Sequence, residues 1–154
     1  MYVTDPTDPD TLARKARLST LARAPGDRLC ALWAAFAPKP PAHDTLRPPE
    51  IGTVMVRGRA GAIGAPFNLG EVTVTRCSVR LASGAVGHGH VQGRNRDAAR
   101  ATALIDALCQ DGQAEAIEAA ILAPLRAEAE AWRSGRAARA AATKVEFFTM
   151  VRGD

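Results

Sequence analysis

Apolar positions in the first third of the chain recur at helical spacing, in two runs that a turn separates. The first run follows a polar lead over residues 1–10 and stops at Pro25-Gly26. The second run, Leu29 to Phe36, comes after Asp27, whose side chain is suited to the N-cap of a helix. We therefore predict two short helices in succession.

The pattern changes twice after these helices. Five prolines between Pro38 and Pro49 exclude a regular helix or a central strand, and predict a stiff connector. β-branched or alternating runs then follow at 51–59, 71–81 and 85–92, with a tight turn at Ser83-Gly84. They predict three strands of an antiparallel meander. The middle run switches its apolar phase, which predicts a bulge near Thr75-Arg76.

Helical spacing returns from Asn95, a suitable N-cap for an apolar stripe that runs to Leu108. Gly112 is expected to end this helix, and Pro124 to lie in the first turn of a long alanine-rich helix that fades near Thr143. The apolar run 145–151 is expected to be an extended, covered segment. It is either a fourth strand of the sheet or an arm docked on another subunit.

These elements predict one α+β domain over residues 1–154, with N-terminal helices, an antiparallel sheet of three to four strands, and C-terminal helices packed on the sheet. Hydrophobic residues make up 47% of the sequence but aromatic residues only 5%. Small side chains bury little area each. We therefore expect a partner subunit to complete the domain.

Charge and targeting signals exclude several functional classes. The net charge is only +4. The sequence also lacks the run of five or six basic residues that a nucleic-acid-binding tail usually has. No apolar stretch reaches about 18 residues, and the polar N-terminal lead does not resemble a signal peptide. We expect a cytoplasmic protein without a membrane partner. Its three cysteines are odd in number and widely spaced, which predicts buried thiols rather than disulfides.

Few residues carry the pattern of a catalytic site. His88 and His90 lie on one strand face, but no cysteine stands near them in sequence, so a half-exposed sheet face is favoured over a metal site. The glycines around them match a dinucleotide-binding fingerprint poorly. No serine or cysteine has the context of an activated nucleophile. We predict no catalytic residues, no metal and no cofactor bound by this chain alone.

Arg94 and Arg96 form the best candidate for binding. They flank a predicted helix N-terminus, whose free amides and dipole favour anions such as phosphate. The alternative is that they pair with Asp97 or with carboxylates of a partner. Three further arginines, at 133, 136 and 139, recur along the last helix and favour a solvated or partner-facing side.

Several stretches together resemble the PhnG family of phosphonate metabolism proteins, over about residue 17 to the C-terminus. They are Gly70-Glu71-Val72-Thr73-Val74-Thr75-Arg76, Val91-Gln92-Gly93-Arg94, Ala103-Leu104-Ile105-Asp106-Ala107-Leu108, Ala123-Pro124-Leu125 and Val145-Glu146-Phe147-Phe148-Thr149-Met150-Val151-Arg152-Gly153.

The resemblance implies a subunit of the carbon-phosphorus lyase core complex, a hetero-oligomer with paired copies that contains PhnH, PhnI and PhnJ. It implies that PhnI, aided by this subunit, PhnH and PhnL, replaces the adenine of MgATP with an alkylphosphonate. On this view Phe147, Phe148, Met150 and Val151 are docking candidates. Arg152 joins Arg94 and Arg96 as a candidate contact to a triphosphate or phosphonate.

Overall fold

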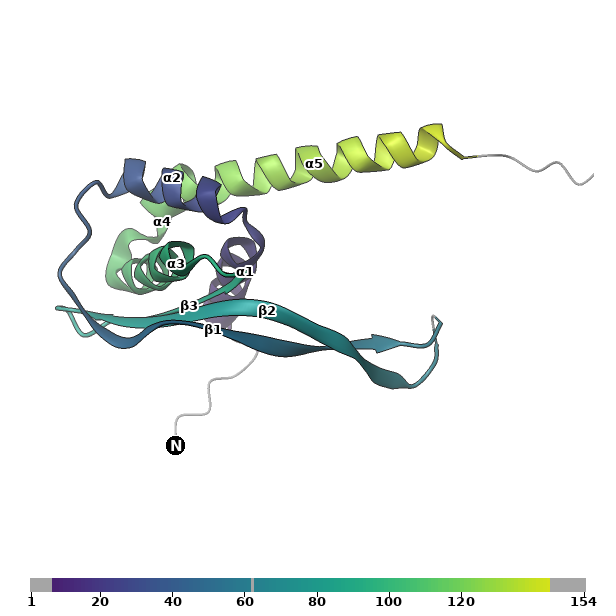
Figure 1. Cartoon of the computed structure of the whole chain (residues 1–154). Coiled ribbons are helices and arrows are strands. Elements are labelled where there is room, and N and C mark those ends of the chain that lie inside the picture. The colour runs from purple at the N-terminus through teal and green to yellow at the C-terminus, as the bar shows by residue number, and fades with distance from the viewer. Residues whose placement is uncertain (1–6, 62, 145–154) are drawn as a thin grey trace, which may run out of the picture.

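A three-stranded antiparallel sheet and a layer of helices on one of its faces make up the computed structural model, which describes residues 7–61 and 63–144 (Figure 1). This confirms the predicted α+β fold. The sheet has the order β1-β2-β3, with strands β1 (His43–Arg59), β2 (Pro66–Leu81) and β3 (Val86–Gln92). The helices are α1 (Pro9–Arg23), α2 (Gly26–Phe36), α3 (Arg96–Leu108), α4 (Ala114–Ile117) and α5 (Ala123–Ala142). The chain kinks after α3 at η1 (Cys109–Gln113), where the backbone of Asp111 and Gly112 is not helical, and a π-helical turn, η2 (Glu118–Leu122), follows α4.

The helix ends follow the capping residues, with one exception. The Asn95 side chain accepts a hydrogen bond from the amide of Ala98 at 2.9 Å, as predicted. Gly112, with φ of +88°, ends the helical run after α3, and Pro124 lies in the first turn of α5. The prediction for Asp27 was wrong, because Pro25 precedes α2 without a side-chain cap and Asp27 lies in the first turn.

Strand β1 begins at His43 rather than at Ile51, so part of the predicted proline-rich connector is strand. Pro48 and Pro49 lie inside it. They are tolerated because β1 is an edge strand and because its register with β2 shifts between Arg47 and Glu50. The prolines lack an amide hydrogen, but at this edge position no backbone hydrogen bond in the centre of the sheet is lost.

The predicted bulge in β2 at Thr75-Arg76 was also wrong. The pairing of β2 with β3 is continuous from Val74 to Arg80, and Thr75, Cys77 and Val79 are buried in alternation on the helix side. The register shifts fall between β1 and β2 instead. Val72 belongs to the opposite face, so its phase reflects a second apolar surface rather than a bulge.

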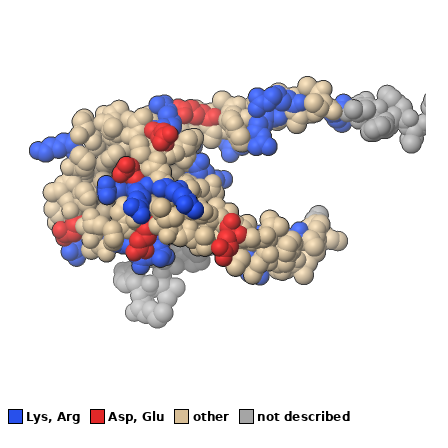
Figure 2. All heavy atoms as spheres, in the orientation of Figure 1, with Lys and Arg blue, Asp and Glu red and all other residues tan. Residues whose placement is uncertain are grey.

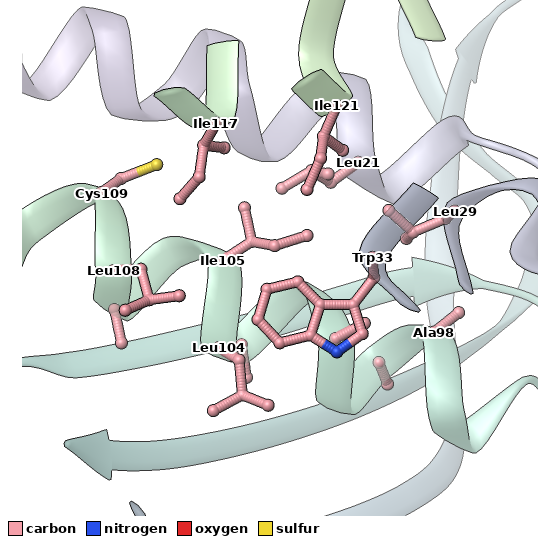
Figure 3. Close-up of a cluster of buried hydrophobic side chains, with 14 of the residues drawn as sticks. Leu21, Leu29, Trp33, Ala98, Leu104, Ile105, Leu108, Cys109, Ile117 and Ile121 are labelled. Atoms are coloured by element: carbon pink, nitrogen blue, oxygen red, sulfur yellow. The ribbon is translucent and has the colours of Figure 1, made fainter. Parts of the chain in front are cut away.

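The core surrounds α3, which packs on β2 and β3 on one side and against the other helices on the other (Figure 3). Its large side chains include Leu21, Leu29, Trp33, Leu104, Ile105, Ile117 and Ile121. Gly87 and Gly89 of β3 let α3 approach closely. A Cβ atom at Gly87 would lie 1.9 Å from the carbonyl oxygen of Ala103, and one at Gly89 would lie 2.1 Å from that of Ala99. The glycine pattern of this strand therefore serves helix packing.

Two elements project from this core in the same direction (Figure 1). Strands β1 and β2 continue beyond the last pairing with β3 as a two-stranded ribbon, which we call the hairpin arm (residues 52–61 and 63–73). In α5, no described residue after Leu125 is buried. The hairpin arm and the outer part of α5 are thus two layers without a core between them.

Candidate docking and anion-binding sites

The most connected polar group in the described part of the chain is the Asp106 carboxylate of α3, whose side chain is 1% exposed. Arg14 of α1 donates to both of its oxygens, from Nε at 3.0 Å and from a terminal nitrogen at 2.7 Å. The backbone amide of His88 donates to Oδ2 at 2.9 Å. Bonding to Asp106 raises the pKa of the Arg14 guanidinium. The carboxylate thus joins α1, α3 and the free edge of β3.

Sequence reasoning missed this cluster, since Arg14 and Asp106 stand far apart in the chain. The available signal was a carboxylate inside an otherwise apolar helical stripe, a position that requires a partner. Gln110 completes the arrangement by donating to the carbonyl oxygen of Val86 at 2.8 Å. Because its oxygens are already bonded to donors, Asp106 is suited to hold the fold together rather than to act as a base.

Arg94 and Arg96 lie where the sequence predicts them, on either side of the Asn95 cap of α3. The turn before them is fixed, because the Thr75 hydroxyl donates to the carbonyl oxygen of Gly93 at 2.8 Å. Asp97 pairs with Arg100 at 3.5 Å rather than with either of them. Within the described residues no carboxylate forms an ion pair with Arg94 or Arg96. Their role in binding an anion stays a prediction.

His88 and His90 lie on the exposed face of β3 because they alternate with Gly87 and Gly89, which face α3. The His88 ring nitrogen Nδ1 lies 2.9 Å from the hydroxyl of Ser78. Partial burial lowers the pKa of His90, and the charge of Arg76 adds to this effect. Over residues 7–61 and 63–144, no group of three or more His, Cys, Asp or Glu side chains is placed to hold a metal ion.

The three thiols show no sign of activation. Cys77 and Cys109 are buried, Cys30 is half-buried, and none forms a disulfide. Burial raises the pKa of each of them. A raised pKa keeps a thiol protonated at neutral pH and makes it a poor nucleophile.

One face of the hairpin arm is apolar along its whole length. Val54 pairs with Val72 and Val56 with Gly70, and the face continues toward the tip with Phe67 beside Gly58. These side chains are uncovered: Val54 is 48% exposed and Leu69, next to Gly58, is 65% exposed. We call this the outer arm face (residues 52, 54, 56, 58, 67, 69, 70 and 72). Contiguous exposed apolar surface of this kind marks an interaction site.

The opposite face of the hairpin arm is mostly polar. Thr53 pairs with Thr73 and Met55 with Glu71, and Arg57 with Asn68. Polar and apolar side chains are thus segregated on a ribbon that has no helix against either side in the described structure. A two-stranded ribbon alone is only marginally stable in water. We therefore expect the hairpin arm to be stabilised by contact with a partner.

Five residues predicted to dock or to bind anions lie outside the described residues: Phe147, Phe148, Met150, Val151 and Arg152. Whether residues 145–151 form a fourth strand of the sheet or an arm docked on another subunit therefore stays a prediction with two alternatives. Among the described helices, none has both the length and the apolar composition needed to cross a bilayer.

Comparison with known proteins decides the family. A profile of the family described as phosphonate metabolism protein PhnG matches residues 12–153. This chain belongs to the PhnG family. It is 43% identical over 147 residues to the protein named alpha-D-ribose 1-methylphosphonate 5-triphosphate synthase subunit PhnG of Rhizobium meliloti (strain 1021), covering 96% of this chain and 94% of that relative.

The PhnG match spans every described helix and strand except the first residues of α1. It therefore includes the hairpin arm, the Asp106 cluster and the whole of α5. None of these is an addition outside the PhnG domain.

Proposed function

We propose that this chain is a subunit of ribose 1-methylphosphonate 5-triphosphate synthase that acts through assembly and contributes no catalytic group of its own. Its partners on this proposal are PhnI, PhnH and PhnJ in the cytoplasmic core complex, with PhnL in the synthase step. MgATP is a substrate of the complex. The name of the relative, a synthase subunit, supports the assignment to this enzyme. The exposed apolar residues of the outer arm face support a role in assembly.

The proposed reaction exchanges one bond at the anomeric carbon of the ribose. A phosphonate oxygen forms a bond to this carbon, the bond from it to adenine breaks, and adenine leaves with the electron pair and takes up a proton. The product is the ribose 1-alkylphosphonate 5-triphosphate. Among the described residues, the one deeply buried carboxylate is Asp106, and it is bonded to Arg14 rather than free to act as a base. The chain therefore assists by holding the catalytic subunit in its working conformation.

The observation that carries this proposal is the outer arm face. Its valines, leucine and phenylalanine are 36% to 65% exposed on a two-stranded ribbon. Permanent subunit interfaces bury about 2,000 Å² or more and are the most apolar protein interfaces. An arm of this composition is expected to pack on another subunit and to gain its rigidity there.

Co-expression with PhnI, PhnH and PhnJ tests the proposal, with co-elution in pull-down and size exclusion as the measurement. The variant is V54K combined with V72E. These residues pair directly across the strands, so the introduced opposite charges keep the ribbon paired while making its outer face polar. We expect the parent chain to co-elute stoichiometrically and the variant to elute alone as a folded monomer.

The matched control is N68S, a polar change on the opposite face of the same ribbon, which should co-elute like the parent. A parent chain that folds but ignores all three subunits would refute the proposed role. Co-elution of the V54K and V72E variant at the parent's stoichiometry would instead show that the outer arm face is not the interface.

A second candidate function is that the chain supplies arginines to a composite triphosphate or phosphonate site. Arg94 and Arg96 favour it, because both lack an ion-pair partner in the described structure and flank the N-terminus of α3. Arg152 belongs to the same candidate set. Alanine at each position should abolish synthase turnover while the complex stays intact. R100A is the control, since Arg100 pairs with Asp97.

A further inference from the structure

The core-facing side of α5 continues beyond the core. Leu125 is buried, and Glu128 on the same side receives hydrogen bonds from Arg28 of α2 at 2.7 and 2.9 Å. Trp132 follows Leu125 after seven residues, and Arg136 and Arg139 come four and seven residues later, so all of them share one side of the helix. Trp132 is 60% exposed. The stripe that packs on the core at the base of α5 is therefore uncovered farther out.

The helix-facing side of the sheet also continues outward. Thr75 is buried under the helices, and Ile51 pairs with it on β1. Two residues farther along, Thr53 pairs with Thr73, and Met55 then pairs with Glu71. Ile51 and Met55 are 42% and 52% exposed, so this inner face also loses its cover.

At the base of the molecule, α3 fills the space between these two surfaces. It packs on β2 and β3 on one side and contacts α2 on the other. Farther out nothing in the described structure takes its place. Figure 2 shows open space between the projecting part of α5 and the hairpin arm, with Lys and Arg side chains gathered along α5. The gap continues a layer that a helix occupies at the base.

The charges on α5 indicate what fits there. Arg133 pairs with Glu130 on another side of the helix. Arg136 and Arg139 have no carboxylate partner among the described residues. The Arg136 guanidinium carbon lies 4.7 Å from the Trp132 ring centre, which fixes the pair as a flat cationic and aromatic surface. Tryptophan and arginine are the residues that most often dominate binding energy at interfaces.

We propose that this gap receives one acidic amphipathic helix from another subunit of the synthase. Its carboxylates face Arg136 and Arg139. Its other side has apolar residues opposite Ile51 and Met55 and polar residues opposite Thr53, Thr73 and Glu71. This inference rests on the proposed function, because it assigns a specific partner element to the assembly subunit. It differs from the outer arm face, which lies on the other side of the ribbon.

The first experiment measures the dissociation constant of the chain from the purified remaining subunits at low and at high salt. R136E combined with R139E should weaken binding about tenfold or more and reduce the salt dependence, because close interfacial charge pairs are lost. R133Q is the matched control and should bind like the parent. Circular dichroism verifies that both variants are folded.

The second experiment identifies the occupant by photo-crosslinking. A benzoylphenylalanine replaces Trp132 in one variant and Met55 in another, and mass spectrometry maps the products. Both positions should crosslink to one segment of one subunit that is rich in Asp and Glu. Crosslinks to different subunits, to a second copy of this chain, to nucleic acid or to its own residues 145–154 would each overturn the inference.

Failure of the two proposals can be told apart. If the parent chain does not bind the other subunits, the proposed function fails. If the parent binds but the R136E and R139E variant binds equally well at both salt concentrations, only the inference about the gap fails.

Discussion

At the scale of single residues, two glycines set the distance between helix and sheet. A Cβ atom at Gly89 would lie 2.1 Å from the carbonyl oxygen of Ala99 and 2.9 Å from the amide nitrogen of Ala103, which are backbone atoms that cannot move independently. We expect G89A to lower the free energy of unfolding by about 3 kcal/mol, the upper end for overpacking. Urea denaturation measures this value.

The control for this prediction is G52A in β1. Nothing lies within 4 Å of a Cβ atom at Gly52, so its free energy of unfolding should change by less than about 0.5 kcal/mol. Equal effects of the two substitutions would show that the glycines of β3 are not required for close packing.

His90 makes folding stability depend on pH. Partial burial and Arg76 lower its pKa in the folded state below the ordinary value of 6.5. As pH falls through 6.5, the unfolded chain therefore takes up this proton more readily than the folded chain, and stability decreases. The H90Q variant should lose less stability than the parent between pH 7 and pH 5. Urea midpoints across that range measure it, and equal slopes would contradict the assignment.

At the scale of elements, α1 is held to the rest of the fold by the Asp106 cluster. D106N would leave the Arg14 guanidinium without its charge partner, and breaking a buried pair costs about 3 to 5 kcal/mol. Since the Arg14 side chain is 35% exposed and water screens it, we expect a loss of only about 2 kcal/mol. Thermal unfolding measures this loss. D97N is the control, because Asp97 is 81% exposed and should contribute little.

The elements themselves could be predicted where the signal is local. Asn95, Gly112 and Pro124 mark helix ends through the conformation of their own backbone or the bond of their own side chain, and the structure confirms them. The early start of β1 could not be predicted in this way. Whether a strand tolerates Pro48 and Pro49 depends on its place at the sheet edge, which is a property of the whole sheet.

The candidate sites, like the elements, could be predicted from the sequence only where the signal is local. Alternation along one strand places His88 and His90 on an exposed face, and a helix start places Arg94 and Arg96 at its N-terminus. The Asp106 cluster needs a contact between residues 14 and 106, which periodicity does not contain. The outer arm face was hidden because its valines were interpreted as a change of phase within one buried strand.

At the scale of the whole molecule, the hairpin arm and α5 both extend farther than the hydrophobic core between the sheet and the helices. The hairpin arm and α5 after Leu125 bury no described side chain, so their backbone hydrogen bonds open without breaking a core contact. In the isolated chain, amide hydrogen exchange should therefore be fast in the hairpin arm and in residues 127–142 and slow in α3. Mass spectrometry of exchanged peptides measures both regions in one experiment.

The assembled complex should change this profile in a specific way. If one partner helix lies in the gap, the hairpin arm and α5 gain protection together, because each is one wall of the same site. The R136E and R139E variant should then lose the protection of α5 and of the inner side of the arm in parallel, while α3 remains slow as an internal control. Protection of the arm alone would mean that the partner binds only its outer face, and that α5 takes no part in the assembly.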